Sequence, residues 1–116
     1  MPAISFRKQF KMLIVRGHKR QTVRAKRKRP IKKGQLLYLY YALRTKHSKL
    51  LRVEKCVEVK SIEIRKNLQI KLDGEYLNNK EIDIFAAKDG FDNAYQFLDF
   101  YRLTHGLPFY GQVIYW

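Results

Sequence analysis

The sequence has a single cysteine, no acidic residue in its first 53 positions and no long hydrophobic run. Because Cys56 is alone, the chain has no internal disulfide and no cysteine-based metal cluster. Residues 1–8 lack the apolar core of a signal peptide, so we expect a cytoplasmic protein in a reducing compartment. The longest apolar run, Leu36–Leu43, has eight residues against the roughly 20 that cross a bilayer as a helix. It predicts a buried strand and no membrane partner.

The missing acids make the charge distribution very uneven. Residues 1–53 hold 17 Lys/Arg and no acid, whereas residues 54–116 hold 8 Lys/Arg and all 10 acids. A half that carries +17 repels itself, so the charge predicts a polyanionic partner. We expect RNA, with DNA as the alternative, and we see no sign of an obligate protein partner. A membrane surface is disfavoured because no long basic amphipathic helix is present.

Length and composition indicate one folded domain over residues 1–116. The chain is 46% hydrophobic and 14% aromatic, which is too apolar for a disordered polypeptide. A chain of this length buries most of the surface that its unfolded form exposes, and it has room for one core.

Nine of the 25 basic residues lie in residues 17–34, between two glycines. Within this stretch Gln21–Arg24 alternates as a strand does, so that Thr22 and Arg24 share one face. Gly17 is placed to end a preceding helix over residues 5–16, in which apolar side chains recur at helical spacing. The pattern therefore predicts a site that rigid elements position, with Lys19 at a sharp corner.

The rest of the chain predicts mostly antiparallel strands followed by two helices. Strands are expected over residues 21–26, 36–43, 68–72 and 111–116, and one long strand over residues 51–63, bent by a bulge between Cys56 and Val57. Asp73-Gly74 predicts a tight hairpin. Helices are expected over residues 80–88, capped by Asn79, and 93–104, capped by Asp92 and closed by Gly106. This order favours an α+β fold: a small, mostly antiparallel β-barrel with about three flanking helices.

The aromatic residues are interpreted mainly as packing. Of Tyr38, Tyr40 and Tyr41, two are expected in the core, and one face of their strand is a possible stacking surface for an unpaired base. The second aromatic group is expected to pack helix against sheet; it comprises Phe91, Tyr95, Phe97, Phe100 and Tyr101.

Four motifs resemble the ASCH domain family, which has a PUA-like barrel. In order they are Gly17-x-Lys19-x-x-Thr22-x-Arg24, Lys33-Gly34-x-x-Leu37, Asp89-Gly90-Phe91 and Gly111-x-Val113-Ile114-x-Trp116. The resemblance covers residues 6–116, and residues 26–30 and 43–46 look like the small stand-alone bacterial or phage members. This chain has Tyr41-Ala42 where the family often has Thr-Gly.

The resemblance implies work on RNA. Members of this family are linked to RNA binding, to ribonuclease activity and to hydrolysis of N4-acetylcytidine by an amidohydrolase that uses a lysine, a threonine and a glutamate. Lys19 and Thr22 match the first two positions, and Asp89 stands for the glutamate with a side chain one methylene shorter. In that role Thr22 is the nucleophile, neutral Lys19 its base, and Asp89 orients Lys19 or the leaving amine.

The main hypothesis is therefore RNA binding through a basic cleft with Thr22 and Asp89 at its floor. The alternative is an amidohydrolase that acts on N4-acetylcytidine or a related modified nucleoside or RNA, or a ribonuclease, and complex formation with an acidic protein is a third hypothesis. The cations expected to bind nucleic acid are Lys19, Arg20, Arg24, Lys26, Arg27, Arg29, Arg44 and Lys46.

Other chemistry has little support in the sequence. His18, His47 and His105 are scattered and, with one cysteine, show no metal-ligand spacing. The basic half has no carboxylate cluster, which disfavours a two-metal nuclease. No dinucleotide or P-loop motif is present, so we expect neither cofactor nor metal.

Overall fold

The computed structural model describes residues 2–116, in which eight strands form two sheets with three α-helices and one 3-10 turn. In chain order the elements are β1 (Ala3–Phe6), the 3-10 turn η1 (Lys8–Phe10), α1 (Lys11–Val15), β2 (Gln21–Ala25), β3 (Leu36–Tyr41), β4 (Lys49–Lys55), β5 (Glu58–Ile64), β6 (Ile70–Leu72), β7 (Glu75–Tyr76), α2 (Asn79–Lys88), α3 (Ala94–Thr104) and β8 (Phe109–Tyr115).

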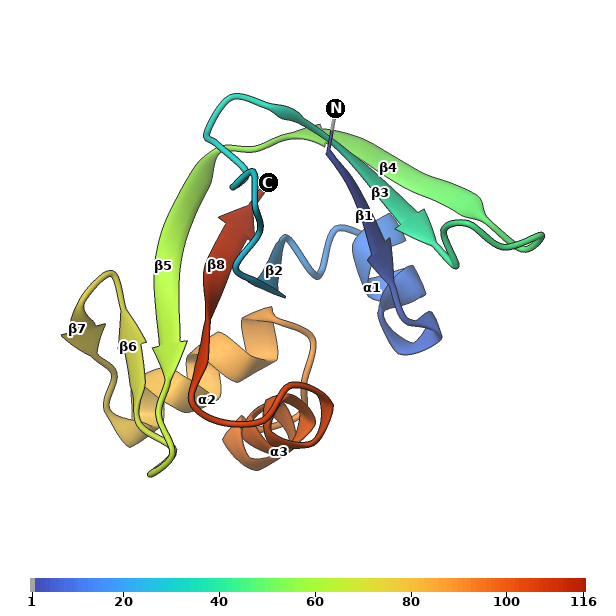
Figure 1. The fold of residues 1–116 in the computed structure, drawn as a ribbon. Helices are drawn as coiled ribbons and strands as arrows, with labels where there is room; N and C mark the ends of the chain where they lie inside the picture. The colour runs from blue at the N-terminus through green and yellow to red at the C-terminus, as the bar shows by residue number, and fades with distance from the viewer. Residues whose placement is uncertain (1) are drawn as a thin grey trace.

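The strands pair as two separate sheets (Figure 1). The smaller sheet has the order β1-β3-β4, with β1 parallel to β3, and the larger has the order β2-β8-β5-β6-β7 and is antiparallel throughout. The prediction of an α+β fold with mostly antiparallel strands is confirmed. Within residues 2–116 no closed barrel is seen. Figure 1 shows α1 beside the smaller sheet and α2 and α3 together at the larger one.

The prediction of one long strand over residues 51–63 is wrong. β4 ends at Lys55 and β5 begins at Glu58, and the two strands belong to different sheets. The break falls at Cys56-Val57, where the bulge was expected. The Cys56 amide donates to the Gln35 carbonyl at 2.8 Å, whereas the next amide, of Val57, donates to Tyr115 at 2.9 Å. Adjacent residues thus join the two sheets.

The expected helix over residues 5–16 is also wrong in its first half. Residues 3–6 form β1, and the α-helix covers only Lys11–Val15. Phe6, Phe10 and Ile14 are all buried, so the apolar spacing was correctly recognised as a core face. Residues 3–6 are extended, and not helical, because the backbone of β1 pairs with β3. Gly17 follows α1 with φ of +75°, as predicted.

The hairpin at Asp73-Gly74 is confirmed, and both later helices form within a residue or two of their predicted bounds. Their N-caps differ: Asn78 caps α2 and Asn93 caps α3, each through a side-chain oxygen that accepts an amide hydrogen bond. Because a cap requires extended backbone immediately before the first helical residue, neighbouring polar residues compete for the position. No helix in residues 2–116 is long and apolar enough to cross a membrane.

Two predictions about aromatic residues need correction. Tyr38, Tyr40 and Tyr41 are all partly exposed, and Leu37 and Leu39 are the residues of β3 that fill the core. Tyr95 is 75% exposed and does not pack. Strand alternation explains the first case, because an apolar run alone does not say which parity faces inward.

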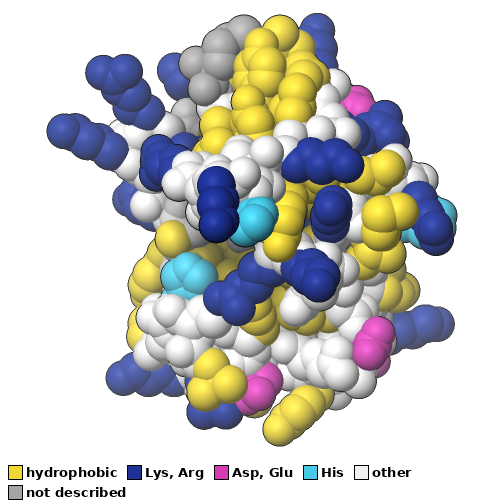
Figure 2. Space-filling view, turned by 90° about the vertical axis from the view of Figure 1, so that its right-hand side faces the viewer, with side chains coloured by type: hydrophobic (Ala, Val, Ile, Leu, Met, Phe, Trp, Pro, Cys, Tyr) yellow, Lys and Arg dark blue, Asp and Glu magenta, His cyan; other side chains and the backbone are white. Residues whose placement is uncertain are grey.

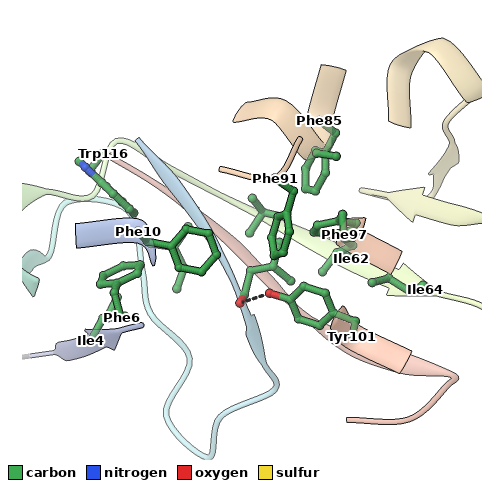
Figure 3. Close-up of a cluster of buried hydrophobic side chains, with 14 of the residues drawn as sticks. Ile4, Phe6, Phe10, Ile62, Ile64, Phe85, Phe91, Phe97, Tyr101 and Trp116 are labelled. Atoms are coloured by element: carbon green, nitrogen blue, oxygen red, sulfur yellow. Dashed lines mark hydrogen bonds between the residues drawn. The ribbon is translucent and has the colours of Figure 1, made fainter. Parts of the chain in front are cut away.

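The aromatic core joins the two sheets to the helices (Figure 3). Phe6 and Phe10 lie with Trp116 on one side, and Phe85, Phe91 and Phe97 lie on the other. The Phe10 and Phe91 rings meet edge to face, with centroids 5.4 Å apart. This packing brings the start of the chain against the region around residue 90, where the candidate site lies.

Candidate functional site

Lys19 is turned into the fold by the corner that follows α1. The amides of His18 and Lys19 both donate to the Leu13 carbonyl, at 2.8 and 3.0 Å, which closes the helix end. Gly17, with positive φ, makes this closure possible without strain. His18 is exposed, whereas only 2% of Lys19 is exposed. The predicted corner is confirmed, and it directs the lysine inward.

Asp89 lies against Lys19. The Lys19 ammonium donates to the main-chain carbonyl of Asp89, and its Nζ is 3.4 Å from Asp89 Oδ1. Gln21 Nε2 donates to the same Oδ1 at 3.4 Å. Asp89 terminates α2, and the following Gly90 has φ of +96° and packs so closely on Phe10 that a Cβ there would lie 2.9 Å from the ring. The shorter carboxylate therefore still reaches the lysine.

Burial acts against both charges of this pair. Desolvation lowers the pKa of Lys19 to about 8, although the Asp89 carboxylate partly offsets it. Desolvation likewise raises the pKa of Asp89, against the opposing effect of Lys19. The Phe10 ring lies under the ammonium, 4.8 Å from Nζ to the centroid. The amine is thus poised to exchange its proton near neutral pH.

Thr22 and Arg24 project from β2 on the same face, as the alternation predicts. Arg24 Nε donates to Thr22 Oγ1 at 3.1 Å, and its guanidinium lies 4.7 Å from the centroid of Phe6. Burial lowers the pKa of Arg24, which still leaves a guanidinium charged at neutral pH. Arg24 forms no ion pair with any carboxylate of residues 2–116. Its terminal N–H groups remain able to bind an anion.

These side chains surround one cavity of about 280 Å³. Lys19, Thr22, Arg24 and Asp89 all line it, so the structure brings the three predicted catalytic residues together with two of the eight predicted nucleic-acid contacts, Lys19 and Arg24. Its other walls are mainly aromatic and include Phe6, Phe10, Phe91, Phe100 and Tyr101. The Tyr101 hydroxyl is occupied, since it donates to the Val23 carbonyl at 2.9 Å (Figure 3).

Arg7 and His105 also line the cavity, and sequence reasoning did not assign either to the site. The Arg7 guanidinium lies 4.8 Å from the Phe100 centroid, and the His105 ring stacks on Tyr101 with centroids 5.5 Å apart. The Arg7 contact joins residues far apart in sequence, whereas His105 caps the end of α3 and stacks on the residue four positions before it. With Arg7, the cavity has three cationic side chains against one carboxylate.

The other six predicted cations lie outside the cavity and are exposed. Arg20 donates from Nε to the Trp116 carbonyl at 3.1 Å. The remaining five lie in the connections on either side of β3; they are Lys26, Arg27, Arg29, Arg44 and Lys46. Figure 2 shows one face of the molecule on which Lys and Arg side chains far outnumber acidic ones. These exposed cations therefore do not contact the cavity.

Within residues 2–116 no three His, Cys, Asp or Glu side chains lie close enough together to hold a metal ion. The cavity instead offers ring faces, a hydroxyl, an ion pair and two arginines. Such a set can enclose a planar group and bind an attached anion. Comparisons with protein-family models, curated proteins and solved structures gave no match.

Proposed function

We propose that this protein binds RNA and that one unpaired nucleotide enters the cavity. Its base lies among the aromatic side chains, where ring faces stack and the buried polar groups can hydrogen-bond to base edges. Arg7 and Arg24 bind the attached phosphate, and the exposed cations bind neighbouring phosphates along the strand.

The observation that most directly supports nucleotide binding is the excess of cations in an aromatic cavity of nucleotide size. Small-molecule sites commonly have volumes of roughly 300–1,000 Å³, so a cavity of about 280 Å³ takes a single small ligand. Lys19 is paired with Asp89, whereas Arg24 has no acidic partner in residues 2–116. An aromatic ligand with a negative group therefore suits the site better than a neutral one.

The ASCH resemblance supports the same class of function. We propose that the two sheets together correspond to the PUA-like barrel of that family. Three of the four residues of its first motif, Lys19, Thr22 and Arg24, line the cavity, and so does Asp89 of its third. This agreement between motif and cavity supports the assignment.

The test is a binding titration of labelled single-stranded RNA, structured RNA and duplex DNA at two salt concentrations. Arg24→Gln should weaken RNA binding at least tenfold, because it removes a phosphate contact inside a desolvated site. Arg65→Gln is the matched control, since Arg65 is exposed and lies outside the cavity. It should change affinity less than twofold. The logarithm of affinity should fall with the logarithm of salt by about 0.7 per phosphate neutralised.

Equal weakening by the two arginine variants would contradict the role of the cavity. Equal affinity for all three nucleic acids, lost together at the higher salt, would reduce the protein to a non-specific anchor. Circular dichroism of each variant checks that the fold is retained.

Hydrolysis of an amide on a modified nucleoside is the second candidate. It is favoured by the meeting of Lys19, Thr22 and Asp89 in one cavity and by the lowered pKa of Lys19, about 8. Thr22 Oγ would attack the amide carbon while neutral Lys19 accepts the hydroxyl proton. The C–N bond then breaks, the amine leaves with that proton, and water releases the acyl group from Thr22.

This candidate predicts deacetylation of N4-acetylcytidine with a marked pH dependence. Because the base must be the neutral amine, kcat/KM should rise about tenfold per pH unit below pH 8 and level off above it. Thr22→Val, which keeps the shape and removes the nucleophile, should abolish turnover. No turnover by the wild type, or full activity of Thr22→Val, would exclude the mechanism. Chromatography of nucleoside products measures both.

A further inference from the structure

The outer face of the smaller sheet is a second feature that the cavity does not explain. Along β3, Leu37 and Leu39 are fully buried, whereas Leu36 is 40% exposed and Tyr38 and Tyr40 are partly exposed. Successive residues of a strand point to opposite faces, so the two tyrosines lie side by side on the face away from the core.

Strand β4 extends this face. Register pairs Tyr38 with Val53 and Tyr40 with Leu50, and directly paired residues lie on the same face. Val53 and Leu50 are 44% and 46% exposed. We call the surface made by Leu36, Tyr38, Tyr40, Leu50 and Val53 the tyrosine face.

Helix α1 packs on the opposite face of the same sheet. Lys11 Nζ lies 5.0 Å from the Tyr41 centroid, and Arg52 Nη1 donates to the Val15 carbonyl at 3.3 Å. Figure 1 shows α1 on that side and no helix over the other. Within residues 2–116 the tyrosine face is therefore an aromatic and aliphatic surface in contact with solvent.

The charges around the tyrosine face favour a polyanion as its occupant. Lys55 pairs with Leu36 on this face, Lys32 and Lys33 precede β3, and Arg44 and Lys46 follow it. The nearest acid in sequence, Glu54, alternates to the other face and accepts from Arg52 Nε at 2.8 Å. Two copies of the chain would bring like charges together here, which opposes a dimer through this face.

One residue, Ser5, is close to both the tyrosine face and the cavity. Ser5 of β1 is in register with Tyr40, and Ser5 is also one of the residues that line the cavity. A strand of roughly six residues is about 17–20 Å long, which leaves room for more than one base.

We propose that the tyrosine face binds single-stranded RNA by stacking unpaired bases on Tyr38 and Tyr40, next to the nucleotide held in the cavity. This inference rests on the proposed RNA binding and assigns the bound segment as single-stranded and longer than one nucleotide. Ring faces stack on any base, so the contact adds affinity with little sequence preference.

The test compares binding of a labelled eight-nucleotide single-stranded RNA with binding of cytidine 5′-monophosphate. The double substitution Tyr38→Ala with Tyr40→Ala should weaken binding of the octanucleotide about 10- to 100-fold and leave the mononucleotide within twofold. The substitution of both by Phe keeps the rings and should retain full affinity. Tyr76→Ala with Tyr95→Ala is the matched control, because both tyrosines are exposed on other elements.

A second measurement needs no substitution. A 2-aminopurine base placed at successive positions of the octanucleotide should lose fluorescence on binding at two or more neighbouring positions, since the cavity alone accounts for only one. This readout stands if the double alanine variant does not fold.

The outcomes separate the two proposals. Octanucleotide affinity unchanged in the double alanine variant, or quenching at a single position, would overturn the stacking role while an effect of Arg24→Gln upholds the cavity. If Tyr38 and Tyr40 contribute to octanucleotide binding but Arg24→Gln leaves the affinity unchanged, the stacking role is upheld and the role of the cavity is overturned. A change of mass in light scattering with unchanged RNA affinity would make the face a contact between copies and overturn the inference. Failure of wild type to bind any RNA overturns both proposals.

Discussion

Asp89→Asn should lower the free energy of unfolding by about 2–3 kcal/mol at pH 7. Removing one partner of a buried ion pair typically costs ~3–5 kcal/mol, because the other charge stays desolvated. Here the cost is limited, since burial already lowers the pKa of Lys19 to about 8, and without Asp89 the amine can give up its proton more easily still. The amide of Asn keeps an oxygen for Gln21. Urea unfolding followed by circular dichroism measures the change.

The same effect should depend on pH with a definite sign. The Asp89 carboxylate stabilises the charged form of Lys19, so its contribution is present below the folded pKa of about 8. It should be lost as pH rises through that value, because Lys19 is then neutral in the wild type as well. The difference between wild type and Asp89→Asn should therefore shrink between pH 7 and pH 9.

Asp92→Asn is the control, because Asp92 is exposed only three residues away and should change stability by less than about 0.5 kcal/mol. The paired variant Lys19→Met with Asp89→Asn should lose less than the two single variants together. A loss below about 1 kcal/mol in Asp89→Asn, or a difference independent of pH, would show that the pair contributes little.

Gly111→Ala should be still more destabilising, by at least about 3 kcal/mol, or should prevent folding. Gly111 lies in β8 between β2 and β5, in register with Ala25 on one side and Ile62 on the other. A Cβ there would lie 2.1 Å from the Arg24 carbonyl oxygen. This oxygen belongs to the backbone of β2, which pairs with β8. The overlap can therefore be relieved only by displacing β2, and Arg24 with it.

Gly74→Ala is the control for adding a methyl group in the sheet region. Gly74 has φ of +82° with nothing within 4 Å of its Cβ position, so only backbone strain of about 1–2 kcal/mol is expected. Thermal unfolding ranks the two variants, and RNA titration of any folded Gly111→Ala protein reports the displaced Arg24. Equal stability of the two would mean that β2 and β8 separate more easily than their contacts indicate.

Features with short-range causes were determined by the sequence itself. The hairpin at Asp73-Gly74 needs only residues that accept positive φ, and α2 and α3 need a cap followed by a periodic apolar face. The concentration of positive charge before residue 54 is likewise a property of the sequence alone. The strand of Thr22 and Arg24 followed from alternation within a few residues.

Tertiary structure decided what depends on distant partners. Phe6 has the apolar spacing of a helix with Phe10 and Ile14, but residues 3–6 pair with β3 and form a strand. Cys56-Val57 divides the strand predicted over residues 51–63 between two sheets because the two amides donate to different segments, at Gln35 and Tyr115. Which parity of β3 faces the core was also left to packing.

In the candidate site, too, some features follow from the sequence and others only from the tertiary structure. Lys19, Thr22 and Asp89 were named from motifs, but the motifs do not say that the lysine is buried or that the carboxylate reaches it. Arg7 and His105 enter the cavity only because β1 and α3 converge there. Sequence determined which charges the protein has. Packing determined which of them left water, and desolvation is what turns a basic sequence into a site with one poised lysine and one largely buried arginine without an acidic partner in residues 2–116.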